Sequence, residues 1–298
     1  EKGMEWINKK ELLTFNEIKR LTKLFAKIGI KKIRLTGGEP LVRKDLGKLV
    51  SMISEIPGIE DLALTTNGYL LAEQVETLYK AGLNRINVSL DSLDPEKFSY
   101  ITRRKLYHKV REGIRAAEKS GIKPIKINVV MIRGVNDDEI LNFANLALKS
   151  SYIIRFIEFM PIGADDGWNI EKIVPTQEII NVIEKGSGKK LIPVERRGKQ
   201  PADRYKFDGG NGEIGFISSV SNPFCNYCNR VRITPDGKLR TCLFSLKETD
   251  LKELIHLNAT DQEITKKIID AVWVKEAGHL INRPGFVRPK RTMSQIGG

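Results

Sequence analysis

The chain has 298 residues, enough to bury a sizeable core, and its 41% hydrophobic and 29% charged residues are typical of a globular protein. No run is long and apolar enough to span a membrane, and no tract of Lys and Arg with interleaved aromatic residues indicates nucleic-acid binding. The net charge of +13 indicates either an anionic partner or a surface rich in Lys and Glu.

A regular alternation of helices and strands is predicted for the first half of the chain. Thr14 and Glu17 have the spacing of a capping box, and an apolar stripe follows them. Helices are predicted over 14–28, 45–56, 72–81, 108–120 and 138–149, and strands over 32–36, 62–66, 85–91, 125–131 and 153–160. Five strands alternating with five helices predict an α/β fold with a parallel sheet.

Polar residues follow the predicted strands, at the end where parallel sheets carry their chemistry. The segment Gly37-Gly38-Glu39-Pro40 is explained either as a tight turn or as backbone that approaches a ligand. Arg34, Lys126 and Arg155 lie within strands. Each alone is best explained by an exposed face, but three on one sheet are as well explained by a shared basic cavity.

The alternation ends after Met160. Residues 161–212 are rich in Pro, Gly and charge, which predicts a connecting region of partly irregular structure with one helix near 176–185. A strand over 213–220 leads to the first cysteine, Thr234-Pro-Asp-Gly237 predicts a turn between two strands, and a last helix follows Thr260.

The only three cysteines are Cys225, Cys228 and Cys242, an odd and clustered set that favours a reducing, cytoplasmic setting over a disulfide framework. Thiolates favour iron–sulfur clusters or zinc, and three leave one coordination position open. Arg230 and Arg232 are two apart, so on an extended segment they share a side and could hold phosphate. A zinc site with a fourth ligand elsewhere and three free thiols stay open, as does a zinc-stabilised RNA-binding module.

Four motifs together carry a resemblance: Lys32-Ile-Arg-Leu-Thr-Gly-Gly-Glu-Pro40, Asn87-Val-Ser-Leu-Asp-Ser-Leu93, the three cysteines with Asn229-Arg-Val-Arg232, and the terminal Gly-Gly. The chain resembles the GTP 3′,8-cyclases of molybdenum cofactor biosynthesis, which are radical S-adenosylmethionine (SAM) enzymes. The resemblance implies an incomplete TIM-type (β/α)6 barrel over 1–160 and a C-terminal region over 161–298 that covers its mouth. The family's Cys-x3-Cys-x2-Cys motif and first barrel strand are expected upstream of Glu1.

The resemblance also implies roles for individual residues. The three cysteines would hold a second 4Fe-4S cluster whose open iron binds guanine, besides the cluster of the upstream motif. The implied GTP contacts are Arg34, Thr65, Lys126, Arg155, Arg230 and Arg232. The implied SAM contacts are Gly38, Glu39, Ser89 and Met160. Arg230, Arg232 and the tail Gly297-Gly298 are implied to be needed for catalysis.

The implied reaction converts GTP to 3′,8-cyclo-7,8-dihydro-GTP. A 5′-deoxyadenosyl radical made from SAM takes hydrogen from C3′ of GTP, and the C3′ radical attacks C8 of guanine. The implied partners are GTP, SAM, an electron donor and the next enzyme of the pathway, cyclic pyranopterin monophosphate synthase. No membrane or nucleic-acid partner is expected, and the protein is expected to be a monomer or a homodimer. Another radical SAM enzyme with an auxiliary cluster, acting for example on a peptide, is the nearest alternative.

Overall fold

The computed structural model describes residues 7–162, 167–194 and 200–297. Its main sheet has eight strands in the order β1-β2-β3-β4-β5-β8-β7-β6. Six of them run parallel, from β1 to β5 and then β8, whereas β7 and β6 are antiparallel. The strands are β1 (Lys32–Leu35), β2 (Asp61–Thr66), β3 (Arg85–Ser89), β4 (Ile125–Met131), β5 (Ile153–Glu158), β6 (Leu191–Val194), β7 (Asp203–Phe207) and β8 (Glu213–Ile217).

The five predicted helices and five predicted strands of the first half are all present. The helices are α1 (Phe15–Lys27), α2 (Leu46–Ser54), α3 (Leu71–Lys80), α5 (Tyr107–Lys119) and α6 (Ile140–Lys149). The capping box at α1 is confirmed, because Thr14 and Glu17 exchange both hydrogen bonds. A further helix, α4 (Pro95–Thr102), was not predicted, although Asp94 at its N-cap and Pro95 at its first position are ordinary start signals.

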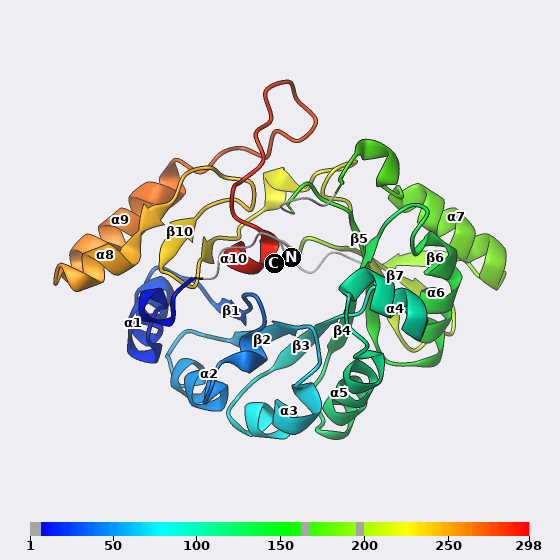
Figure 1. Cartoon of the computed structure of the whole chain (residues 1–298), viewed down its shortest axis with the longest axis horizontal. Helices are drawn as coiled ribbons and strands as arrows, with labels where there is room; N and C mark the ends of the chain where they lie inside the picture. Colours follow the sequence, from blue (N-terminus) through cyan, green and yellow to red (C-terminus); the bar gives the residue numbers. More distant parts are fainter. Residues whose placement is uncertain (1–6, 163–166, 195–199, 298) are drawn as a thin grey trace.

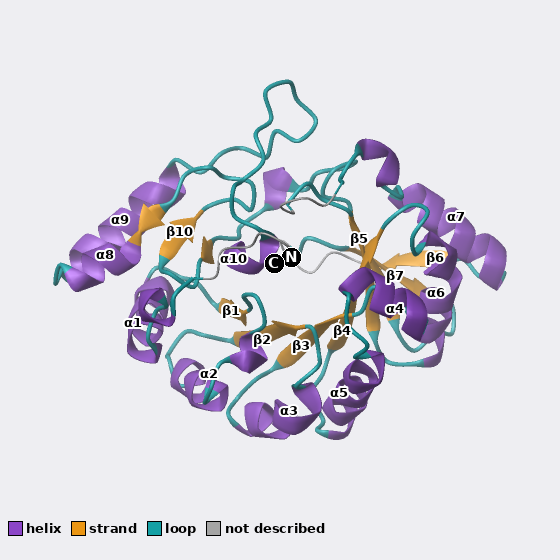
Figure 2. Cartoon of the chain, viewed as in Figure 1, coloured by secondary structure: helices purple, strands orange, loops and turns teal. Residues whose placement is uncertain are grey.

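Residues alternate in character along the central strands, which gives the sheet two different faces. In β4 every second residue is buried, from Ile125 to Met131, while Lys126 and Asn128 lie between them and are half-buried. The apolar set packs against the helices in one large core. The sheet is curved, with helices on its outer side (Figure 2). Because the apolar set packs against these helices, the polar residues face the concave side.

The region predicted as a partly irregular connection is more ordered than expected. The predicted helix is present as α7 (Thr176–Ser187), but β6 and β7 form a hairpin that extends the main sheet. The predicted strand that leads to the cysteines is β8, and it pairs with β5 in parallel. The sheet therefore continues past residue 160.

The rest of the chain forms a smaller layer beside the sheet. Three short antiparallel strands, β9 (Arg232–Ile233), β10 (Lys238–Arg240) and β11 (Thr249–Asp250), precede α8 (Leu251–His256) and α9 (Asp261–Trp273). The predicted turn joins β9 to β10, and Gly237 adopts the φ of 85° that it requires. Apolar side chains of α1 pack with those of α8 and α9 in a second core, so these three helices lie together at one edge (Figure 1).

The described part of the chain ends inside the concave side of the sheet. The last helix, α10 (Met293–Ile296), lies near the middle of the molecule in Figure 1. Gly297 approaches β1 so closely that an added Cβ would lie 2.9 Å from a methyl carbon of Thr36. Short 3-10 turns complete the described structure at Lys9–Glu11, Pro40–Val42, Asp137–Glu139, Ile170–Lys172 and Cys225–Tyr227.

Candidate functional site

A cavity of about 830 Å³ opens on the polar face of the sheet. One flank is apolar and is formed mainly by α1 and α2, and the other is cationic. Of the predicted site residues, six line this cavity: Arg34, Lys126, Arg155, Arg230, Arg232 and Gly297. The shared basic cavity, one of two explanations for the strand cations, is therefore the correct one.

Arg155 is fixed at the centre of this face by two asparagines. Its Nε donates to Asn128 Oδ1 at 2.8 Å, and its terminal Nη2 donates to Asn87 Oδ1 at 3.0 Å. Asn87 in turn donates to the backbone of Leu64 and to the Oγ1 of Thr65, at 3.1 and 3.0 Å. Thr65 is not itself among the cavity-lining residues. The asparagines are neutral acceptors, so they orient Arg155 without cancelling its charge.

The cations of the cavity destabilise one another's charged forms, which lowers their pKa values. Burial, and then the charges of Arg155, Arg85 and Arg34, lowers the pKa of Lys126 to about 7. Burial and neighbouring cations likewise lower the pKa of Arg155 to about 9, and those of Arg34 and Arg232 to about 10. A cluster of like charges with few carboxylates has a strong affinity for an anion.

The part of the chain that carries the three cysteines, residues 225–242, is called the cysteine segment, and a buried carboxylate attaches it to the sheet. Glu158, the last residue of β5, accepts hydrogen bonds from the backbone N–H groups of Val220 and Ser221 at 2.7 and 2.9 Å, and from the Ser221 hydroxyl. These bonds fix the chain a few residues before Cys225.

Lys275, which follows α9, also hydrogen-bonds to the cysteine segment. Lys275 donates to the carbonyls of Cys228 and Arg230, each at 2.9 Å, and its Nζ lies 3.8 Å from Cys228 Sγ. Burial raises the pKa of Cys228, but Arg230 and Lys275 outweigh that effect, so the pKa is lowered. Gly278 leaves room for Cys225, because a Cβ there would lie 3.1 Å from Cys225 Cβ and 3.3 Å from its sulfur.

The three thiols are all half-buried and free of disulfides. Within residues 7–162, 167–194 and 200–297, no three His, Cys, Asp or Glu side chains stand close enough to hold one metal ion. A single zinc ion requires such a group. A 4Fe-4S cluster distributes its thiolates over different iron atoms, so its ligands stand farther apart.

The C-terminal tail contacts the second arginine of the segment. Arg232 donates through Nε to the carbonyl of Gly297 at 3.3 Å. Arg291, just ahead of α10, pairs with Asp236 at 3.1 and 2.8 Å and with Glu248, which anchors the tail to the β9–β10 turn. Gly298 lies outside the described residues.

The predicted SAM positions lie in loops at the carboxyl ends of the strands and along the tail. A Cβ on Gly38 would lie 3.9 Å from the carbonyl oxygen of Ser294. Glu39 accepts hydrogen bonds from Leu41 N at 3.0 Å, and from Thr66 Oγ1 and Asn67 N at 2.7 Å each. Ser89 is the last residue of β3, and Met160 packs against the hydrophobic cluster that includes Ile296 of the tail.

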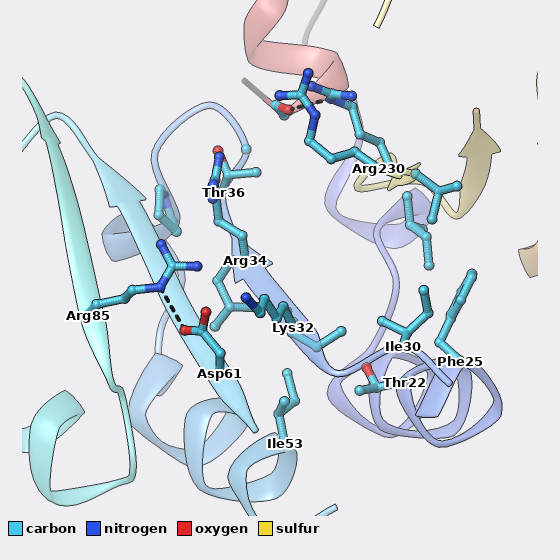
Figure 3. A pocket seen from close by; sticks show the side chains of 18 of the residues that line it. Thr22, Phe25, Ile30, Lys32, Arg34, Thr36, Ile53, Asp61, Arg85 and Arg230 are labelled. Carbon is cyan, nitrogen blue, oxygen red and sulfur yellow. Dashed lines mark hydrogen bonds and ion pairs between the residues drawn. The ribbon is translucent and has the colours of Figure 1, made fainter. Parts of the chain in front are cut away.

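The polar residues of the site that were not predicted as site residues include Asp61, Arg85, Asn87 and Arg204. Asn87 orients Arg155, and the other three line the cavity, as Figure 3 shows for Arg85 and Asp61. The period of two along a strand could have found Arg85 and Asn87, because they precede Ser89 by four and two positions.

Comparisons with known proteins agree with this geometry. Residues 2–147 match the Radical SAM superfamily, and residues 152–281 match the family described as Molybdenum Cofactor Synthesis C. The chain is 47% identical to the GTP 3′,8-cyclase of Syntrophomonas wolfei, over all of this chain and 91% of the relative. It is 42% identical to that of Streptomyces coelicolor, over all of this chain and 88% of the relative.

The fold is similar to that of Streptococcus suis SuiB bound to S-adenosylmethionine, with a TM-score of 0.57 and 15% identity over 87% of this chain and 61% of that one. This likeness supports the radical SAM fold alone. Among the described residues, no helix is long and apolar enough to cross a membrane.

Proposed function

Because the chain belongs to the GTP 3′,8-cyclases of the radical SAM superfamily, we propose that its cationic cavity holds GTP for conversion to 3′,8-cyclo-7,8-dihydro-GTP. This reaction begins molybdenum cofactor biosynthesis. The observation that supports the proposal most directly is that strand cations and the arginines of the cysteine segment line one cavity. The alternatives of a zinc-stabilised RNA-binding module and of a peptide-directed radical SAM enzyme have no comparable support.

The charges of the cavity suit a triphosphate. GTP carries about four negative charges at neutral pH, and Arg and Lys side chains neutralise them with hydrogen bonds that are stronger than neutral ones. We assign Arg34, Lys126 and Arg155 to the phosphates, with Arg155 oriented by Asn87 and Asn128. We also assign Thr65 to the GTP site, since its hydroxyl accepts a hydrogen bond from Asn87.

The cysteine segment suits the base end of the nucleotide. Cys225, Cys228 and Cys242 would hold a second 4Fe-4S cluster, and Arg230 and Arg232 would contact GTP beside it. The three thiols form no disulfide, and Arg230 and Lys275 lower the pKa of Cys228, which favours its thiolate. Holding GTP at both ends fixes the ribose between them, which is the orientation that a reaction at C3′ requires.

The radical chemistry is supplied by SAM and the superfamily's 4Fe-4S cluster when these are bound. The protein's part is to orient both substrates. Gly38, Glu39, Ser89 and Met160 would form the SAM site at the carboxyl ends of the strands. Since the Glu39 carboxylate already accepts three hydrogen bonds, we expect it to act by shaping its loop.

The tail would complete the site from the concave side. Gly297 lines the cavity and accepts from Arg232, so it can fix that guanidinium toward the substrate. We propose that Gly297 and Gly298 are needed for catalysis for this reason. Residues 1–160 would supply the SAM site and most phosphate ligands, and 161–298 the second cluster and the tail. An electron donor and the next enzyme of the pathway remain proposed partners.

The experiment is GTP titration by calorimetry after anaerobic reconstitution with iron and sulfide. We expect Arg230→Ala and Arg232→Ala each to weaken GTP binding by about tenfold or more, because each removes hydrogen bonds between charged groups. Arg115→Ala is the matched control, since Arg115 is exposed on α5, away from the cavity. Unchanged GTP affinity in both cavity variants would overturn the proposal.

A further inference from the structure

Arg85 forms an ion pair in the wall of the cavity with the single acidic residue among the described residues that line it. Its Nε lies 2.7 Å from Asp61 Oδ1, and the two side chains are only 17% and 20% exposed. Among the described residues, ten cations line the same cavity, and Asp61 is the one negative charge against them: Lys31, Lys32, Arg34, Arg43, Arg85, Lys126, Arg155, Arg204, Arg230 and Arg232. A carboxylate placed here therefore needs a specific explanation.

The pair uses only part of the guanidinium. Arg–carboxylate pairs often form two parallel hydrogen bonds, but Arg85 donates to Asp61 through Nε alone. Within the described parts of the chain its two terminal nitrogens make no hydrogen bond, and neither is among the buried atoms that lack a partner. Figure 3 shows them on the side of the guanidinium away from Asp61. They are available to a second anion.

The position of Arg85 is at the end of the cavity far from the cysteines. Arg85 and Asp61 are the first residues of β3 and β2, whereas the predicted SAM loops lie at the opposite ends of these strands. Arg232 lies toward those opposite ends, because it contacts Gly297, and Gly297 packs against Thr36, the residue after β1.

We propose that Arg85, held by Asp61, is a specificity-determining ligand of the terminal phosphate, so that the site selects a nucleoside triphosphate over a diphosphate. This inference rests on the proposed binding of GTP in the cavity. With its base end beside the cysteine segment, a diphosphate would end near Arg34 and Arg155, whereas a third phosphate would extend to Arg85. The bond to Asp61 fixes the guanidinium before binding, which reduces the ordering that the ligand must impose.

The test compares the affinities of GTP and GDP by calorimetry, with reconstituted wild type, Arg85→Ala and Arg85→Gln. We expect both variants to weaken GTP binding by about tenfold or more and to leave GDP binding within about twofold, because only the terminal phosphate loses its charged partner. We expect Asp61→Asn to weaken GTP binding less, by about threefold, since the guanidinium stays but loses its orientation.

Two variants serve as controls for folding. The double variant Asp61→Asn with Arg85→Gln leaves no unpaired charge in the wall, and Arg115→Ala changes an exposed arginine. Equal weakening of GTP and GDP, or no change for either, would overturn the role of Arg85. Those results are distinct from a failure of the proposed function, in which the wild type itself would bind no GTP or Arg232→Ala would bind it normally.

Discussion

Lys126 should make GTP binding depend on pH close to neutrality. Burial and the charges of Arg155, Arg85 and Arg34 lower its pKa to about 7 in the ligand-free protein. A bound triphosphate favours the ammonium form and raises that pKa again, so binding draws a proton onto Lys126. Affinity is then greatest below the free pKa and is lost as the pH rises through it.

The size of this effect follows from the free pKa. At about pH 7 roughly half of the Lys126 side chains are charged, and one pH unit higher only about a tenth are. GTP affinity should therefore be about twofold below its maximum at pH 7 and about tenfold below it at pH 8, until the pKa of the complex is reached. Arg155, Arg34 and Arg232 stay largely charged at pH 7 and pH 8, because their pKa values are about 9 for Arg155 and about 10 for the other two.

The assay is GTP calorimetry from about pH 6 to about pH 9, in buffers of different ionisation enthalpy, with wild type and Lys126→Gln. The ionisation of the GTP phosphate is the same for both proteins, so the difference between their pH profiles isolates Lys126. Lys119→Gln, at an exposed position on α5, is the matched control. Parallel pH profiles for wild type and Lys126→Gln would refute the reasoning.

Three further substitutions test the supports of the site. Asn87→Leu should weaken GTP binding about tenfold in calorimetry, because Arg155 loses a hydrogen bond that orients it; wild-type affinity would contradict this role. Glu158→Gln should lower the free energy of unfolding by about 2 kcal/mol, since three donors lose a charged acceptor, and urea unfolding measures it against wild type. Gly278→Ala should reduce the iron bound after reconstitution, because its Cβ would press on Cys225 at 3.1 Å. An unchanged iron content would contradict this prediction.

The separation of the proposed SAM and phosphate positions follows from the parallel strands. Gly38 and Ser89 lie at or beyond the carboxyl ends of β1 and β3, and Arg85 is the first residue of β3. In the proposed site, the two substrates therefore approach the same strands from opposite ends, with the ribose between them. This arrangement explains why the strand interiors carry Arg and Lys that an ordinary packed barrel would replace with apolar residues.

The sequence by itself determined the local elements of the first half of the chain. The capping box at Thr14, the turn at Gly237 and the alternation along β4 all depend on residues close together in the chain. The family also followed from local motifs.

Only the tertiary structure decided which side chains share a site. Sequence spacing could not show whether Arg34, Lys126 and Arg155 face solvent or one another, because that depends on the curvature of a sheet whose strands pair over long distances. It also missed the antiparallel pair of β6 and β7, because these short strands depend on pairing with the free edge of β8. The contact of Arg232 with Gly297, which joins residues 65 positions apart in the chain, likewise depends on the tertiary structure.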